Sequence, residues 1–124
     1  MKKLFAMFAL VSSFALADVY TAADPYFAEA SAIADMLGAT WIGDGGLERD
    51  YPVMALNLPP MSSESVKAQV DVALLDAKTA GVLTPLSPWY LHETGMTMRI
   101  YEGEAGKFTV AFQDSQMALM FEPK

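Results

Sequence analysis

Cysteine is absent from this chain of 124 residues, and histidine occurs once, as His92. Without thiols the protein has no means of forming disulfides, thiolate metal sites or a cysteine nucleophile. A zinc site made of several imidazoles is impossible with one histidine. A serine triad would have to use His92, but the nearby Ser87 lies between two prolines and not in a nucleophile elbow. We therefore expect a protein without catalytic activity and without a cofactor.

Positive charge is scarce as well. The chain has 8 lysines and arginines against 15 acidic residues, and Lys2 and Lys3 lie in a segment that we expect to be removed. The remaining chain then carries a net charge of about −9 by simple counting. A surface of this sign repels phosphate backbones and anionic lipid heads, which argues against nucleic acid as a partner. We expect the partner to be another protein, or a neutral or cationic small ligand.

The longest apolar run lies near the N-terminus, and later runs do not exceed the five residues 117–121. Two lysines precede the apolar segment 4–17, which ends in Ala-Leu-Ala, the small-residue motif of a signal-peptidase site. This segment has 14 residues, whereas a helix that spans a membrane needs about 20. We therefore predict a cleaved secretory signal peptide at 1–17 and a single small domain at 18–124. The domain is expected to be periplasmic or extracellular, with no stable membrane insertion.

Two amphipathic helices are predicted in the exported domain. Asp24 is a suitable cap, and Pro25 suits the first helical position, where its missing N–H has no partner. Apolar residues then recur at helical spacing, which indicates a helix over 24–37. A second helix begins after Ser62 or Ser63 and carries one continuous apolar stripe.

Alternation of apolar and polar residues predicts the strands. A long loop joins the first two strands into a hairpin, and the last three form a meander after an irregular segment with two prolines. This pattern favours the α+β class, an antiparallel sheet with two helices packed on one face, in the order helix, two strands, helix, two or three strands. The expected strands are 39–42, 51–58, 96–101, 107–113 and 117–121, with a short edge strand at 18–22 as an optional addition.

Trp89 and Tyr90 are candidate binding residues. They lie in the irregular, proline-flanked segment 82–95, and loops on a rigid scaffold often carry recognition. Tryptophan and tyrosine are favoured anchors at interfaces. The alternative is that the segment folds back over the core. Our first hypothesis is a small exported binding or interaction protein that contacts its partner through these two residues.

His92, Met96 and Met98 suggest a second hypothesis, which is soft-metal binding. Thioether sulfur and imidazole are ligands suited to Cu(I). However, Met96 and Met98 alternate into Ile100, so we expect this strand face to pack in the core, where methionine is a common gap-filler. Convergence of the three side chains on an open site would favour copper, whereas burial of both sulfurs would oppose it.

Carboxylates support two further alternatives. Asp44, Glu48 and Asp50 lie in a glycine-bearing loop and offer oxygen ligands to calcium, although their spacing does not match an EF-hand and Arg49 opposes a cation. A small hydrolase would require a cleft with two facing acids, one of them with a raised pKa. The sequence does not select such a pair.

The signal-peptide prediction has a direct test. Mass spectrometry of protein isolated from the exporting host should find a chain that begins at Asp18, because cleavage follows the Ala-Leu-Ala motif. Soluble cytoplasmic protein that retains Met1 would contradict the prediction.

Overall fold

The computed structural model describes residues 24–42 and 52–124. The expected signal peptide, the edge strand at 18–22 and the calcium-ligand candidates Asp44, Glu48 and Asp50 lie outside the described residues. The elements in chain order are α1 (Phe27–Leu37), β2 (Thr40–Trp41), β3 (Val53–Asn57), α2 (Ser63–Ala73), α3 (Leu75–Thr79), β4 (Thr84–Pro85), β5 (Tyr90–Leu91), β6 (Thr97–Gly103), β7 (Gly106–Gln113) and β8 (Gln116–Pro123).

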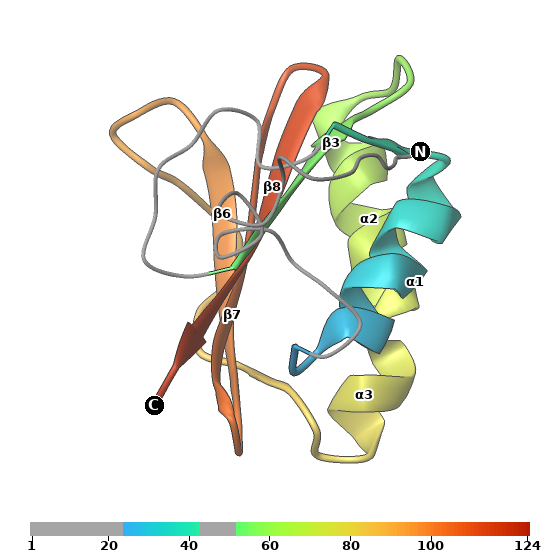
Figure 1. Cartoon of the computed structure of the whole chain (residues 1–124). Helices are drawn as coiled ribbons and strands as arrows, with labels where there is room; N and C mark the ends of the chain where they lie inside the picture. The colour runs from blue at the N-terminus through green and yellow to red at the C-terminus, as the bar shows by residue number, and fades with distance from the viewer. Residues whose placement is uncertain (1–23, 43–51) are drawn as a thin grey trace, which may run out of the picture.

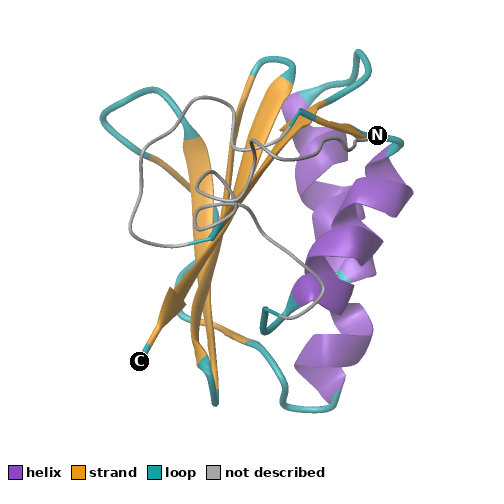
Figure 2. Ribbon diagram, viewed as in Figure 1, coloured by secondary structure: helices purple, strands orange, loops and turns teal. Residues whose placement is uncertain are grey.

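The fold has two layers (Figures 1 and 2). The strands form one seven-stranded antiparallel sheet in the order β2-β3-β8-β7-β6-β4, and β5 also pairs with β6. The described helices all lie against one face of this sheet, on the right in Figure 1. The predicted α+β class is confirmed, and the predicted order fits apart from an added helix, α3, and two added strands, β4 and β5. None of the described helices has the length and apolar character needed to cross a membrane.

Helix α1 begins later than its sequence signals indicate. Its capping position is Tyr26, which has a left-handed φ of 64° and makes no side-chain capping bond. The Tyr26 ring packs edge-on against Phe108 and Phe121, with ring centroids 6.1 and 5.6 Å apart. Aromatic packing against the sheet therefore sets the start of the helix. Gly38, with a left-handed φ of 67°, ends it.

Helix α2 begins as predicted. The Ser62 hydroxyl accepts a hydrogen bond of 3.1 Å from the Ser65 N–H, which satisfies one of the free amides of the first turn. The single helix expected here is interrupted at the buried Leu74, and α3 continues from it.

The segment 82–95, which the sequence assigns to no regular element, contributes β4 and β5 along the edge of β6. Between these two strands the Leu86 N–H donates to the Ile100 carbonyl at 2.8 Å. Prolines are tolerated in an edge strand because a missing N–H can face away from the ladder. Pro85 therefore lies within β4 even though proline usually argues against a strand.

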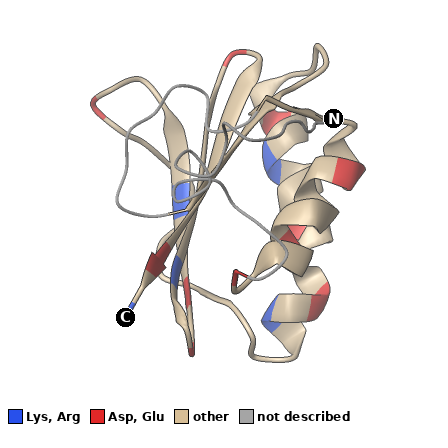
Figure 3. Cartoon of the chain, viewed as in Figure 1, with Lys and Arg blue, Asp and Glu red and all other residues tan. Residues whose placement is uncertain are grey.

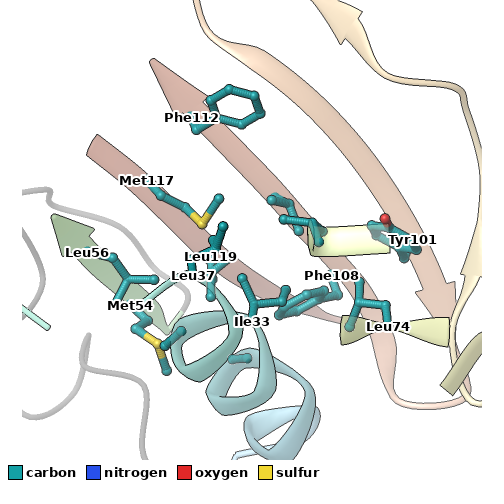
Figure 4. Packing of buried hydrophobic residues seen from close by; sticks show 14 of the residues in the cluster. Ile33, Leu37, Met54, Leu56, Leu74, Tyr101, Phe108, Phe112, Met117 and Leu119 are labelled. Atoms are coloured by element: carbon teal, nitrogen blue, oxygen red, sulfur yellow. The ribbon is translucent and has the colours of Figure 1, made fainter. Parts of the chain in front are cut away.

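Large apolar side chains fill the space between the sheet and the helices (Figure 4). Tyr101, Phe108 and Phe121 pair in register across β6, β7 and β8, and all three are buried. They meet Ile33 of α1 and Leu74 in one continuous cluster. This cluster is the hydrophobic core that the two amphipathic helices were expected to cover.

The face of strand β6 that meets the helices is the opposite of the one expected. Arg99 and Tyr101 face the helices, because they pair with Val110 and Phe108 of the core. Met98 therefore lies on the other face of the sheet and is only half-buried. The prediction that Met98 continues into the core with Ile100 is wrong, because alternation alone does not say which of two apolar faces meets the helices.

Candidate functional site

Three alanines line up on the face of the sheet away from the helices, which we call the outer face. Ala55 of β3 pairs with Ala118 of β8, and Ala118 pairs with Ala111 of β7. In the next strand Ala111 pairs with Met98. A methyl side chain reaches only a short distance from the sheet, so three adjacent alanines leave a depression between larger neighbours.

The depression opens into a cavity of about 680 Å³ over the outer face. It extends from the end of β2 to the turns that precede β6 and β8. The lining residues described are Ile42, Ala55, Leu56, His92, Thr94, Met96, Met98, Ala111, Gln113, Asp114, Ser115, Gln116, Met117, Ala118 and Met120.

Thioethers form much of the wall of this cavity. Met98 and Met120 are half-buried on the outer face, and Met96 lines the cavity next to the β5–β6 turn. Methionine is unbranched and polarisable, so its side chain adapts to apolar groups of different shape. Ile42 closes the opposite side, where its N–H donates to the Ala55 carbonyl at 2.9 Å.

Polar groups gather at one end of the cavity, where two turns come together. One is the turn 92–95, which contributes His92 and Thr94. The other is the tight β7–β8 turn at Asp114 and Ser115. Asp114 has a left-handed φ of 55°, which aspartate tolerates better than most residues. The cavity is therefore apolar along its floor and polar at this end.

His92 is held in a defined orientation by its own turn. Its N–H donates to the Met96 carbonyl at 2.8 Å, and its carbonyl accepts from the Gly95 N–H at 2.9 Å. The Thr94 N–H donates to the ring Nδ1 at 3.2 Å, and the Thr94 hydroxyl lies 3.0 Å from the same nitrogen. The imidazole is thus fixed from within a four-residue turn.

The structure brings His92, Met96 and Met98 to one cavity. Strand pairing explains this, because Met98 lies opposite Tyr90 and the His92–Met96 bond extends the same hairpin. Residues two apart on a strand share a face. The sulfurs therefore do not point into the core between sheet and helices, which was the arrangement that would oppose a metal role.

Trp89 is placed differently from an exposed recognition residue. It is half-buried against the core, and its ring packs edge-on against Phe112 at 5.8 Å between centroids. Its Nε1–H donates to an Asp71 carboxylate oxygen at 3.3 Å, and Arg99 donates to the same oxygen at 2.9 Å. Trp89 thus ties the edge segment to α2. A binding role for Trp89 and Tyr90 stays a prediction.

Arg99 links this cluster to the sheet. Its Nε–H donates to the Ser87 carbonyl at 3.0 Å, and its guanidinium lies 5.5 Å from the centre of the Tyr101 ring. Burial raises the pKa of Tyr101 to about 12, against the opposing effect of the Arg99 cation. Tyr101 is therefore neutral at physiological pH, and the charges of the cluster are those of Arg99 and Asp71.

Among the described residues, the carboxylates form neither a metal site nor a pair of facing acids along the cavity. No group of three or more His, Asp or Glu side chains there has the geometry to hold a metal ion. Asp114 is the single acid among the described residues that line the cavity. The facing pair of acids required by the hydrolase hypothesis is thus not found in that part of the cavity wall.

Comparison of the chain with protein families, with curated proteins and with solved structures found no match. Function must therefore be inferred from the geometry of the chain itself.

Sequence reasoning missed the alanine floor. Ala55 lies far along the chain from Ala111 and Ala118, and each of the three is unremarkable within its own strand. The available signal was an alanine at a strand position where a large apolar residue would continue the alternation. To infer from it that the three alanines are neighbours, the strand order and register must already be known.

Replacement of Trp89 by alanine should weaken the fold and not only a contact with a partner. We expect the free energy of unfolding to fall by about 2 kcal/mol or more, because the ring packs on Phe112 and its N–H is bonded. Urea unfolding followed by circular dichroism measures this. Leu91→Ala is the control, since Leu91 is 73% exposed and should change stability by less than about 0.5 kcal/mol. Equal stability of the two variants would contradict the structural role.

Proposed function

We propose that this protein is an exported, non-catalytic binding protein that holds a small ligand in the cavity over Ala55, Ala111 and Ala118. The observation that supports this proposal is the cavity itself, about 680 Å³ in volume. Ligand sites typically measure about 300–1,000 Å³ and combine an apolar lining with a few placed polar groups.

The position of the cavity favours a preformed site. Its floor lies on β7 and β8, which pair over their full length in the interior of the sheet. The other face of these strands carries Phe108, Phe112 and Leu119, all buried in the core. A floor supported in this way does not need to move when a ligand binds, which lowers the cost of binding.

Charge limits the kind of ligand. Lysine and arginine are scattered over helices and strands (Figure 3), and none is among the described residues that line the cavity. Asp114 is the charged side chain at its polar end. A neutral or cationic ligand is therefore compatible with the site, in line with the acidic composition of the chain.

Filling the floor tests the proposal. Ala111→Phe should weaken binding of the neutral dye N-phenylnaphthylamine by about tenfold or more, because Ala111 lines the cavity but is only 1% exposed, so the added ring must take up cavity volume that the ligand would fill. Fluorescence titration measures the affinity, and thermal unfolding checks that the variant is folded.

Ala68→Phe is the matched control for this experiment. Ala68 is exposed on α2, so the same ring is added away from the cavity and dye binding should remain at the level of the unaltered protein. Failure of the unaltered protein to bind the dye, or equal binding by both folded variants, would reject the cavity as the site.

Copper binding is a second candidate function, because His92, Met96 and Met98 line the same cavity with Met120. An imidazole and thioethers together form a ligand set suited to Cu(I). The arrangement has one unfavourable feature. A metal-bound histidine usually donates its second ring N–H to a neighbour, whereas the Nδ1 of His92 accepts from Thr94.

Leucine substitution separates the two candidates. Met98→Leu keeps apolar volume but removes the sulfur, so it should retain dye binding and, if the copper candidate is correct, lose about tenfold in Cu(I) affinity. Competition with a chromophoric Cu(I) chelator under anaerobic conditions measures this affinity. Met61→Leu is the control, because Met61 contacts Gln69 of α2 and does not line the cavity. Unaltered protein that takes no Cu(I) from the chelator would reject the copper candidate.

A further inference from the structure

We infer that the ligand of this cavity is an amphipathic molecule whose uncharged head presents a hydrogen-bond acceptor, such as an amide or carbonyl oxygen, to the Nε2–H of His92. This inference rests on the proposed binding function and adds the chemical class of the ligand. It depends on the tautomer of His92, on the charge of the polar end and on the direction of the apolar floor.

The tautomer follows from the turn 92–95. A backbone N–H always donates, so the Thr94 N–H, 3.2 Å from Nδ1, requires a lone pair on that nitrogen. A neutral imidazole with an unprotonated Nδ1 carries its proton on Nε2. His92 lines the cavity, and the donor of its neutral ring is therefore the Nε2–H. A neutral ring that binds a metal through Nε2 would carry its proton on Nδ1, against the Thr94 N–H.

The charge of the polar end argues against an anionic head. Asp114 lines this end of the cavity, and no described lysine or arginine lines it. A carboxylate ligand would lose its hydration next to a like charge and gain no cation in return. An uncharged acceptor takes the same hydrogen bond from His92 without that cost.

The floor sets where the rest of the ligand lies. From the turns at 92–95 and 113–116, the lining continues over the alanine row toward Ile42 and Met120. These residues offer methyl groups and one thioether. Their side chains contain no hydrogen-bonding group apart from the weakly accepting sulfur. A ligand with its head at His92 thus places an apolar body over Ala111 and Ala118.

Matched probes with one alkyl chain and different heads test the inference. Decanamide should bind the unaltered protein about fivefold or more tightly than decanoate, as measured by displacement of N-phenylnaphthylamine. His92→Phe should weaken decanamide about fivefold, and His92→Gln, which keeps a donor, should restore most of the affinity. Decyltrimethylammonium has no acceptor in its head, so its affinity should not respond to either substitution.

The outcomes separate the two proposals. If no probe displaces the dye and the unaltered protein does not bind it, the proposed function itself fails. If the probes bind but decanamide has no advantage over decanoate, or His92→Phe leaves decanamide affinity unchanged, the site stands and the inferred head chemistry is overturned.

Nitrogen NMR of the imidazole gives an independent reading, because the chain contains one histidine and the two ring nitrogens can be told apart by their couplings to the ring protons. At a pH where the ring is neutral, the spectrum should show an unprotonated Nδ1 and a protonated Nε2, and the Nε2 signal should shift when decanamide is added. A protonated Nδ1 in the neutral ring would overturn the inference and favour the metal role instead.

Discussion

The segregation of side-chain size across strands β7 and β8 is the constraint on which the rest of the structure depends. The face of these strands toward the helices carries Phe108, Phe112 and Leu119, whereas the outer face carries Ala111 and Ala118 between polar residues toward both strand ends. Large groups on one side supply the buried area that stabilises the domain. Small groups on the other side line the cavity although they are themselves buried. One alternation therefore produces both the core and the cavity floor.

The edge of the sheet has a second organising contact, the carboxylate of Asp71. It receives hydrogen bonds from Arg99 and Trp89, and thereby connects α2 to β6 and to the segment that precedes β5. Asp71 is about half exposed at its side chain, so the ion pair with Arg99 adds only modest stability. Its greater effect is positional, because β5 leads directly into the turn that orients His92.

The sequence predicted correctly those features that depend on a local pattern. It was misleading where one pattern is compatible with two arrangements of a strand. The helix cap at Ser62 and the three strands of the meander follow from local patterns and are confirmed. The direction in which β6 faces was predicted wrongly, since methionine and isoleucine at alternate positions suit either of two apolar faces. Strands β4 and β5 were missed because their pairing with β6, and not their composition, makes them strands.

In the candidate site, too, some features were predictable from local sequence and others depended on the fold. His92, Met96 and Met98 were grouped from their spacing, and hairpin geometry does bring them to one cavity. The alanine floor was beyond prediction because it joins three strands whose order is a property of the fold. The role of His92 was beyond prediction too, since it depends on which ring nitrogen the Thr94 amide meets.

The lining combines adaptable methionine walls with a polar end in which the orientation of His92 is fixed by its own turn, and this combination bears on selectivity. Met96, Met98 and Met120 can repack around apolar groups of different shape, so they discriminate weakly between them. A hydrogen-bonding group whose orientation is fixed discriminates more strongly, because a ligand without the matching atom leaves it unpaired on burial. His92 is such a group, held by its own turn. Selectivity in this cavity is therefore expected to arise at the head of the ligand, and tolerance along its apolar body.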